Sequence, residues 1–237
     1  MSFKAKLAVG AATFAMVGGG LGVAGTLTAS AATPSCGKNC ISLYTQKFGP
    51  HYFVDVYQAR AAAGQESILF QGSNSDPALD FTYKYSGTVG SFYTSYGLVS
   101  AAFAHTYSSD PAFEFQYSPY GVNSGFCLST WPGEAPQPGY KVRLEPCGAY
   151  SNSLWVADFG SRGGRNVVKD PRSVTGFDVP LINGATNNFS NPEVLNYPAG
   201  HPTDYPRPVL NVQPENTYSN GTVFDNQEWG VKRGPLS

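Results

Sequence analysis

An aromatic residue recurs at a fixed interval along this chain. Phe81, Trp155 and Trp229 follow one another at intervals of 74 residues, and each closes a triplet that begins two residues earlier. Because successive side chains of a strand point to opposite faces, the first and third residues of each triplet face the same way. A fixed interval of this kind indicates stacked or symmetric supersecondary units. The recurrence predicts a fold of repeated β units around shared aromatic residues.

The segments upstream of these aromatic residues share one order: a strand, a polar loop with a glycine, a second strand, and the closing triplet. The apolar and polar residues alternate, which favours strands. We expect the first strands at 53–56, 126–129 and 209–212, followed by Gly64, Gly139 and Gly221. A shorter match relates 74–83 to 108–117, where an Asp-Pro turn precedes another alternating strand.

The composition supports a β protein. Charged residues make up 13% of the 237 residues, against about 25% in an average soluble domain. The chain has 27 Gly, 18 Pro, 15 Tyr and 15 Phe, and its formal charge is −1. This excludes a helical bundle, a coiled coil and a nucleic-acid binder that depends on charge. We therefore expect an all-β protein with no nucleic-acid partner.

Residues 1–31 are predicted to be a secretory signal peptide. Lys4 and Lys6 precede an apolar stretch at 7–17, and residues 29–31 (Ala-Ser-Ala) provide the small-x-small cleavage pattern. The alternative is a retained transmembrane helix over 7–24, but this stretch contains five glycines. We expect a secreted, extracellular protein with no membrane span after cleavage, and a single domain over 32–237.

The four cysteines, Cys36, Cys40, Cys127 and Cys147, are expected to form disulfides because an exported chain with an even number usually pairs them. Three connectivities are possible. Short loops close most readily, which favours Cys36 with Cys40 and Cys127 with Cys147. The Cys36–Cys40 spacing is one residue longer than the redox Cys-x-x-Cys, and no histidine is near. We expect no metal and no cofactor.

The chain from about 53 to 233 resembles the ricin-type β-trefoil repeat (ricin B-like lectins). The best match is 121–158, which contains Cys127-Leu128, the Val142–Cys147 strand and Trp155, and the last repeat supplies the closing motif Asp225–Trp229. The resemblance implies a β-trefoil-like fold with long loop insertions. Its layout would be an N-terminal Cys loop (32–48), repeats at about 49–117, 118–158 and 200–233, and an insertion at 159–199. An arrangement of nearer five shorter repeats is the alternative.

In that family, an Asp after the Cys-Leu pair accepts hydrogen bonds from two hydroxyls of a galactose-like sugar. An aromatic ring stacks on the sugar, and an amide near the closing motif adds donors. The resemblance places the Asp position at Asp55, Ser129 and Asn211, and the amide position at Asn152 and Asn226. The aromatic candidates in the following loops are Trp131, Tyr57 and Tyr218.

Some of these residues could also have a purely structural role. An Asp at the end of a strand often caps a turn. Strand alternation predicts that Phe81, Trp155 and Trp229 face the core, and the resemblance implies that Gln227 braces the backbone. Trp131, which precedes Pro-Gly in a loop, is the strongest candidate for an exposed binding aromatic.

The sequence offers little for catalysis. His51, His105 and His201 do not have a metal-ligand spacing, and no Gly-x-Ser-x-Gly motif is present. We therefore expect no catalytic residues and a non-catalytic carbohydrate-binding protein whose partner is a glycan. The alternatives are a secreted interaction or inhibitor module that contacts a secreted or cell-surface protein, and a glycan hydrolase with a carboxylate pair.

Overall fold

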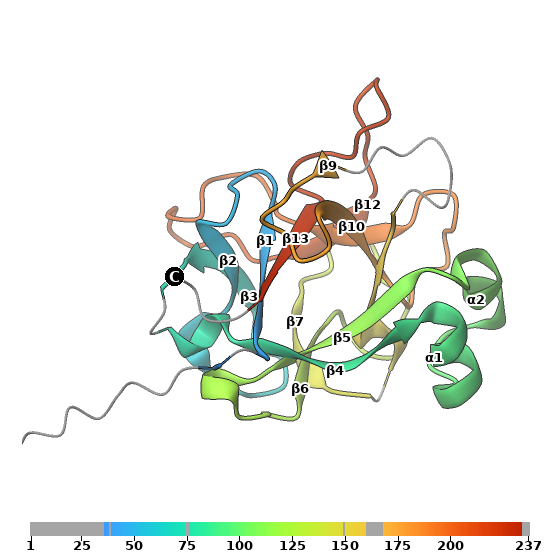
Figure 1. Cartoon of the computed structure of the whole chain (residues 1–237), viewed down its shortest axis with the longest axis horizontal. Coiled ribbons are helices and arrows are strands. Elements are labelled where there is room, and N and C mark those ends of the chain that lie inside the picture. The colour runs from blue at the N-terminus through green and yellow to red at the C-terminus, as the bar shows by residue number, and fades with distance from the viewer. Residues whose placement is uncertain (1–35, 38, 74–75, 149, 160–167, 234–237) are drawn as a thin grey trace, which may run out of the picture. The chain divides into compact units, whose positions relative to one another are not determined.

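The computed structural model of the chain describes residues 36–37, 39–73, 76–148, 150–159 and 168–233 (Figure 1). The expected signal peptide lies outside the described residues. Within them the chain forms thirteen strands and two α-helices. The strands are β1 (Ile41–Thr45), β2 (Tyr52–Val56), β3 (Ser67–Gln71), β4 (Phe81–Thr88), β5 (Pro111–Tyr117), β6 (Phe126–Ser129), β7 (Arg143–Pro146), β8 (Leu154–Ala157), β9 (Val168–Lys169), β10 (Phe177–Asn183), β11 (Glu193–Asn196), β12 (Asn211–Pro214) and β13 (Glu228–Arg233). The helices are α1 (Val89–Tyr96) and α2 (Ala101–Tyr107).

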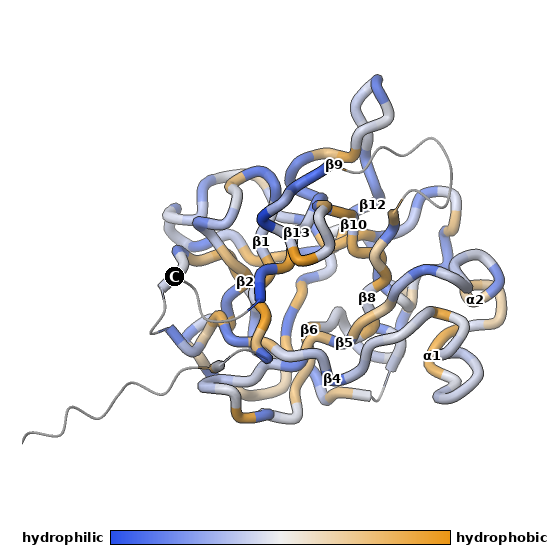
Figure 2. The backbone as a smooth tube through the Cα atoms, viewed as in Figure 1, coloured by the Kyte–Doolittle hydropathy of each residue, from blue (hydrophilic) through white to orange (hydrophobic). Residues whose placement is uncertain are grey.

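Six strands close into an antiparallel barrel. The ring runs β1, β4, β5, β8, β10 and β13, and β13 pairs again with β1. Phe81, Trp155 and Trp229 lie in the main hydrophobic core and are no more than 1% exposed. Figure 2 shows hydrophobic segments along several of these strands and hydrophilic residues on many loops. Closure leaves the barrel with no open strand edge.

The remaining long strands form three hairpins, β2–β3, β6–β7 and β11–β12. Each hairpin lies in sequence between two barrel strands, so the chain consists of three four-stranded repeats, at 41–88, 111–157 and 177–233. We call the three hairpins together the cap. A six-stranded barrel with three such hairpins is a β-trefoil, so the expected all-β, trefoil-like fold class is confirmed.

Backbone hydrogen bonds in the cap relate the three repeats to one another. The Ser67 amide donates to the Val142 carbonyl (3.0 Å), the Val142 amide to the Leu210 carbonyl (2.7 Å), and the Leu210 amide to the Ser67 carbonyl (2.8 Å). This cyclic set of bonds identifies these three residues as equivalent positions of the repeats.

The closing tryptophans of the second and third repeats form equivalent hydrogen bonds. The indole nitrogen of Trp155 donates to the Leu128 carbonyl at 2.8 Å, and that of Trp229 donates to the Leu195 carbonyl at 2.8 Å. Both carbonyls belong to the first strand of the hairpin in the same repeat. Phe81 occupies this position in the first repeat and has no donor to offer.

The third repeat differs from the layout expected from the sequence. The segment 209–212, expected to be its first hairpin strand, leads into β12, the second strand, and pairs with β11. The expected insertion at 159–199 contains β9, β10 and β11. The reason is that Val209–Val212 has the same apolar and polar alternation as Phe53–Val56, and alternation does not distinguish the first strand of a hairpin from the second.

A helical segment interrupts the chain between β4 and β5. Helices α1 and α2 lie side by side at one end of these strands (Figure 1). They pack on the outward faces of the barrel through a second hydrophobic cluster that includes Phe92, Phe103 and Val156. The 34-residue sequence match is also explained, because β4 and β5 pair with each other and are the strands of the two matching segments.

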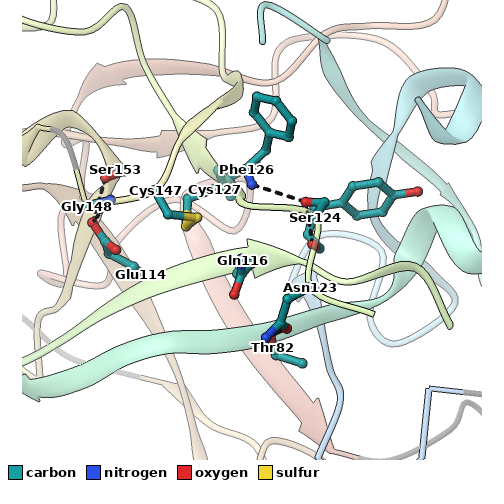
Figure 3. Close-up of a disulfide and its surroundings, with 12 residues drawn as sticks. Thr82, Glu114, Gln116, Asn123, Ser124, Phe126, Cys127, Cys147, Gly148 and Ser153 are labelled. Atoms are coloured by element: carbon teal, nitrogen blue, oxygen red, sulfur yellow. Dashed lines mark hydrogen bonds between the residues drawn. A yellow bond between two sulfur atoms is a disulfide. The ribbon is translucent and has the colours of Figure 1, made fainter. Parts of the chain in front are cut away.

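Both disulfides form with the pairing that loop closure favours, Cys36 with Cys40 and Cys127 with Cys147. The second joins β6 to the residue that follows β7 (Figure 3). In the described part of the chain, no helix is long and apolar enough to cross a membrane. No cluster of potential metal ligands is found among the same residues.

Candidate functional site

The strand register identifies the three positions that correspond to the expected sugar-binding Asp. Tyr44 pairs with Phe53, Gln116 with Cys127, and Ile182 with Val194. The residue two places further along is Asp55 in the first repeat, Ser129 in the second and Asn196 in the third. The structure therefore places Asn196, and not Asn211, at this position of the third repeat.

Asp55 lies at the wall of an open depression of about 440 Å³ on the first repeat. Its side chain is on β2 and is 4% exposed. Tyr57, Phe70, Asp76 and Arg207 line the same depression. Among the described residues, no side chain or amide forms a hydrogen bond or ion pair with the Asp55 carboxyl group.

Burial determines the electrostatics of Asp55. Loss of hydration, with a smaller contribution from the nearby Asp76 charge, raises the pKa of its carboxyl to about 8, while Arg207 acts in the opposite direction. A carboxyl that is buried without donors favours its neutral form. Donor groups brought by a ligand would reverse this preference.

Local turns hold the walls of the depression. After β2 the chain turns through Gln58 and Ala59, which adopt positive φ values of 61° and 53° and leave the Tyr57 side chain 41% exposed. On the other side, Asp76 accepts a hydrogen bond from the Ala78 amide (3.0 Å) and caps the short turn that leads into β4. Asp76 is therefore both a turn cap and a residue of the depression.

The guanidinium of Arg207 lies 4.0 Å from the centre of the Phe70 ring. The site residues expected from the sequence do not include Phe70, Asp76 or Arg207. Phe70 could have been found from its position two residues after Ile68, because the two side chains then face the same side of β3; Phe70 is only partly buried. Arg207 comes from the third repeat, and nothing in the local sequence indicates its contact with the first.

The equivalent position in the second repeat is already occupied by internal hydrogen bonds. The Ser129 hydroxyl donates to the Thr130 carbonyl (2.9 Å). The Asn152 amide nitrogen donates to the Thr130 hydroxyl and to the Glu134 carbonyl, and its oxygen accepts from the Gly133 amide. Asn152 is 1% exposed, so it braces the loop after β6.

Trp131 lies in a separate depression of about 540 Å³, with Tyr140, Lys141 and Arg143 in its walls. Its ring is 53% exposed, as expected for a loop aromatic. The Arg143 guanidinium lies 3.8 Å from the ring centre and forms an ion pair with Glu145 at 2.7 Å. One face of the indole is therefore covered by a cation.

The third repeat brings three asparagines together. Asn226 donates to the Asn196 side-chain oxygen (2.9 Å) and to the Tyr197 carbonyl (2.8 Å), and Asn196 donates to the Asn211 side-chain oxygen (2.7 Å). Asn211 and Asn226 are thus joined through Asn196. Tyr218 lies in the loop before β13 and packs on Phe224, with ring centres 4.6 Å apart.

Asn196 is the site residue that the sequence reading missed in this repeat. The signal was present, because Val194-Leu195-Asn196 has the pattern of Phe53-Val54-Asp55 and Cys127-Leu128-Ser129. Gln227 contacts backbone at two points: it donates to the Pro214 carbonyl (3.0 Å) and accepts from the Asn216 amide (2.8 Å).

A second group of carboxyls is enclosed against the outside of the barrel. The Tyr44 hydroxyl donates a hydrogen bond to the Asp170 carboxylate (3.0 Å). Asp170 also accepts hydrogen bonds from two side-chain nitrogens of Arg172, each at 2.8 Å. Asp178 and Glu228 are 0% exposed. Burial and nearby carboxylates raise the pKa of Asp178 to about 7 and that of Glu228 to about 8, while Arg172 lowers the pKa of Asp170 to about 2. The three carboxyls are no more than 3% exposed.

Fold and site together define a β-trefoil protein with an open, carboxyl-containing depression on its first repeat. No family model matches the sequence, and no curated protein matches it. Among solved structures, an exo-β-1,3-galactanase from Clostridium thermocellum has a TM-score of 0.50 at 9% identity. The match covers 82% of this chain, which spans 30% of that protein.

Two further solved structures are similar. ThreeFoil, a designed three-fold symmetric protein, has a TM-score of 0.49 at 14% identity, with 82% of this chain and 98% of that chain covered. The Rhizoctonia solani agglutinin has a TM-score of 0.45 at 13% identity, with 83% and 95% covered. At such identities the likeness concerns the fold alone.

Proposed function

We propose that the protein is a secreted, non-catalytic carbohydrate-binding protein of the lectin type, and that it binds sugar in the depression around Asp55. One observation carries the proposal: the buried Asp55 carboxyl, which accepts no hydrogen bond from the described residues, faces an open depression that also contains aromatic surface. A carboxylate in such a place is complementary to a ligand that supplies hydroxyl groups.

The chemistry of the depression suits an uncharged polyol. The two oxygens of Asp55 can accept hydrogen bonds from adjacent hydroxyls, because their separation matches that of vicinal hydroxyl groups. The exposed ring of Tyr57 provides an apolar face for the C–H side of a pyranose. Ligands of this kind bind in concave sites with a few well-placed polar groups.

The proposal of secretion rests on the signal-peptide pattern of residues 1–31 and on the disulfides. Disulfides form and persist in oxidising compartments and are rare in the cytosol. Cleavage after residue 31 is tested by N-terminal sequencing of the protein recovered from the medium. A mature N-terminus well beyond residue 31, or retention of the chain inside the cell, would contradict the proposal.

A glycan array with the protein beginning at residue 32 tests sugar binding. We expect binding to at least one neutral glycan, and a loss of at least tenfold in affinity for Asp55→Asn, which keeps the shape and removes the charge. Asp225→Asn removes an exposed carboxyl outside the depression and is the matched control. Absence of binding to every glycan at tens of micromolar would overturn the proposal.

Glycan hydrolysis is a second candidate function, and one observation favours it. The pKa of Asp55 is raised to about 8, as a general acid requires, and Asp76 lines the same depression. Reducing-end assays on a panel of polysaccharides test it. Release of sugar that is abolished by both Asp55→Asn and Asp76→Asn would replace the binding proposal with a hydrolase.

A further inference from the structure

The depression around Asp55 is continuous with a second hollow. Tyr57, Ile68, Tyr205 and Arg207 line both the depression and a neighbouring hollow of about 330 Å³. Lys141 then lines both this hollow and the depression that contains Trp131. We call the resulting path, from Asp55 past Tyr205 and Lys141 to Trp131, the cap groove.

The cap groove crosses all three repeats. Tyr57 comes from the loop after β2, Tyr205 from the segment before β12, and Trp131 from the loop after β6. The cyclic backbone bonds of Ser67 and its equivalents hold these segments together beneath the groove. A ligand that occupied the whole groove would therefore contact a surface that no single repeat provides.

Exposed aromatic rings occur along the cap groove. Tyr57 is 41% exposed, Trp131 53% and Tyr205 96%. Rings of this kind can stack on a ligand that has repeated apolar faces. A chain of pyranose units has such faces at regular intervals, with hydroxyls between them.

The cations of the cap groove already have partners. Lys141 forms an ion pair with Glu66 at 2.5 Å, Arg143 with Glu145 at 2.7 Å, and Arg207 lies over the Phe70 ring. Asp55 and Asp76 add acidic groups at one end. This arrangement offers no surplus positive charge to an anionic polymer.

A peptide is a poorer match to the cap groove. Extended peptides bind most readily by adding a strand to an open sheet edge. The barrel strands form a closed ring, and the strands of the cap bond to one another around their common axis. The closed barrel therefore offers a peptide no open strand edge to pair with, and a peptide would have to bind through its side chains.

We propose that the cap groove binds an uncharged oligosaccharide chain along its length, rather than a single terminal sugar. This rests on the proposed carbohydrate binding and specifies the class of ligand. The Asp55 end holds one sugar unit by its hydroxyls, and Tyr205 and Trp131 stack on units further along the chain.

The test is calorimetric titration with neutral oligosaccharides of one to six units derived from galactan, glucan, mannan and xylan. For at least one series we expect affinity to rise at least tenfold from one unit to four or more. Trp131→Ala should lower the affinity for the hexamer about tenfold and change the affinity for the monosaccharide less than twofold. Tyr205→Ala, at a side chain that lines both the Asp55 depression and the neighbouring hollow, should also lower the affinity for the hexamer about tenfold.

Tyr218→Ala is the control, because Tyr218 packs on Phe224 outside the cap groove. Affinity that does not depend on length, with no effect of Trp131→Ala or Tyr205→Ala, would overturn the groove and leave sugar binding at Asp55 intact. Binding of oligogalacturonate or of peptide alone would overturn the choice of ligand. Absence of binding by every sugar would overturn both proposals.

Discussion

At the scale of single residues, Asp55 makes the strongest prediction about the site. Its carboxyl has a pKa of about 8 in the free protein, so most molecules carry a proton on it at pH 7. A sugar that donates two hydroxyls binds the ionised form. Affinity for a neutral glycan should therefore rise about tenfold from pH 7 to pH 9, as the ionised fraction rises.

Titrations of one neutral glycan at a series of pH values measure this effect. Binding should also release a proton near pH 7, which calorimetry in buffers of different ionisation enthalpy detects. An affinity that is constant or falls between pH 7 and pH 9 would show that the carboxylate of Asp55 does not hold the ligand.

Trp155 and Trp229 make a second prediction at this scale. Trp155→Phe and Trp229→Phe each remove the indole donor and leave a buried carbonyl, Leu128 or Leu195, without its partner. Each change should lower the free energy of unfolding by about 2 kcal/mol, and the two losses should be similar because the contacts are equivalent. Urea unfolding measures both. A loss confined to one of them would contradict the equivalence of the repeats.

The same residues show what the sequence could predict. The interval between the closing aromatics indicates repeated β units because their burial requires large apolar side chains at fixed places. The interval does not identify Asn196 as a site residue. Val209–Val212 has the alternation expected of a first hairpin strand and is followed by Gly221, so the sequence favours Asn211 at this position. The position of Arg207 beside Phe70 depends on how the repeats meet, and strand alternation carries no information about that.

At the scale of elements, the two disulfides should differ in their effect. Cys127–Cys147 closes a loop with a sequence separation of 20 and joins β6 to the residue that follows β7, while Cys36–Cys40 has a separation of 4. Loop-closure entropy predicts a loss of about 3 kcal/mol for the Cys127→Ala/Cys147→Ala variant and about 2 kcal/mol for the Cys36→Ala/Cys40→Ala variant. Urea unfolding of the two double variants is the measurement, and the reverse order would contradict this account.

Helices α1 and α2 show the limit of prediction at this scale. The residues of α1 are mostly Gly, Ser, Thr and aromatics, which are weak helix formers, whereas α2 contains three alanines. The ends of α1 are stabilised by a capping box between Thr88 and Ser91 and by Gly97, which ends the helix at a φ of 63°. Helix α2 is held by packing, because Phe103 lies in the second hydrophobic cluster. Tertiary contacts therefore override a local composition that favours turns and strands.

At the scale of the whole repeat architecture, the three repeats share backbone geometry and differ in chemistry. The second and third repeats use their amide residues, Asn152 and Asn226, to bind neighbouring protein groups. The first repeat has Ala78 at the matching place, three residues before Phe81, and leaves Asp55 without such a donor. In the proposed function, the hydroxyl groups of the ligand supply the hydrogen bonds that this amide position does not.

The buried carboxyls give the last prediction, on the pH dependence of stability. Asp178 and Glu228 hold their protons up to about pH 7 and 8 in the folded state and release them near pH 4 when unfolded. The folded state thus binds more protons between these values, so stability should fall as the pH rises from about 4 to 8. Asp170 acts oppositely, because its folded pKa of about 2 gives stability that is lost as the pH falls below 4.

The melting temperature should therefore be highest near pH 4 to 5 and lower by at least about 5 °C at pH 8, measured by calorimetry at constant salt. Glu228→Gln replaces the buried acid with a neutral amide of the same shape, and the slope between pH 5 and pH 8 should become shallower. Glu134→Gln, at an exposed carboxyl that does not contribute to the raised pKa of Asp178 or Glu228, should keep the slope of the natural chain. A melting temperature that rises from pH 5 to pH 8 would show that these carboxyls are ionised inside the folded protein, and that the fold tolerates two buried charges.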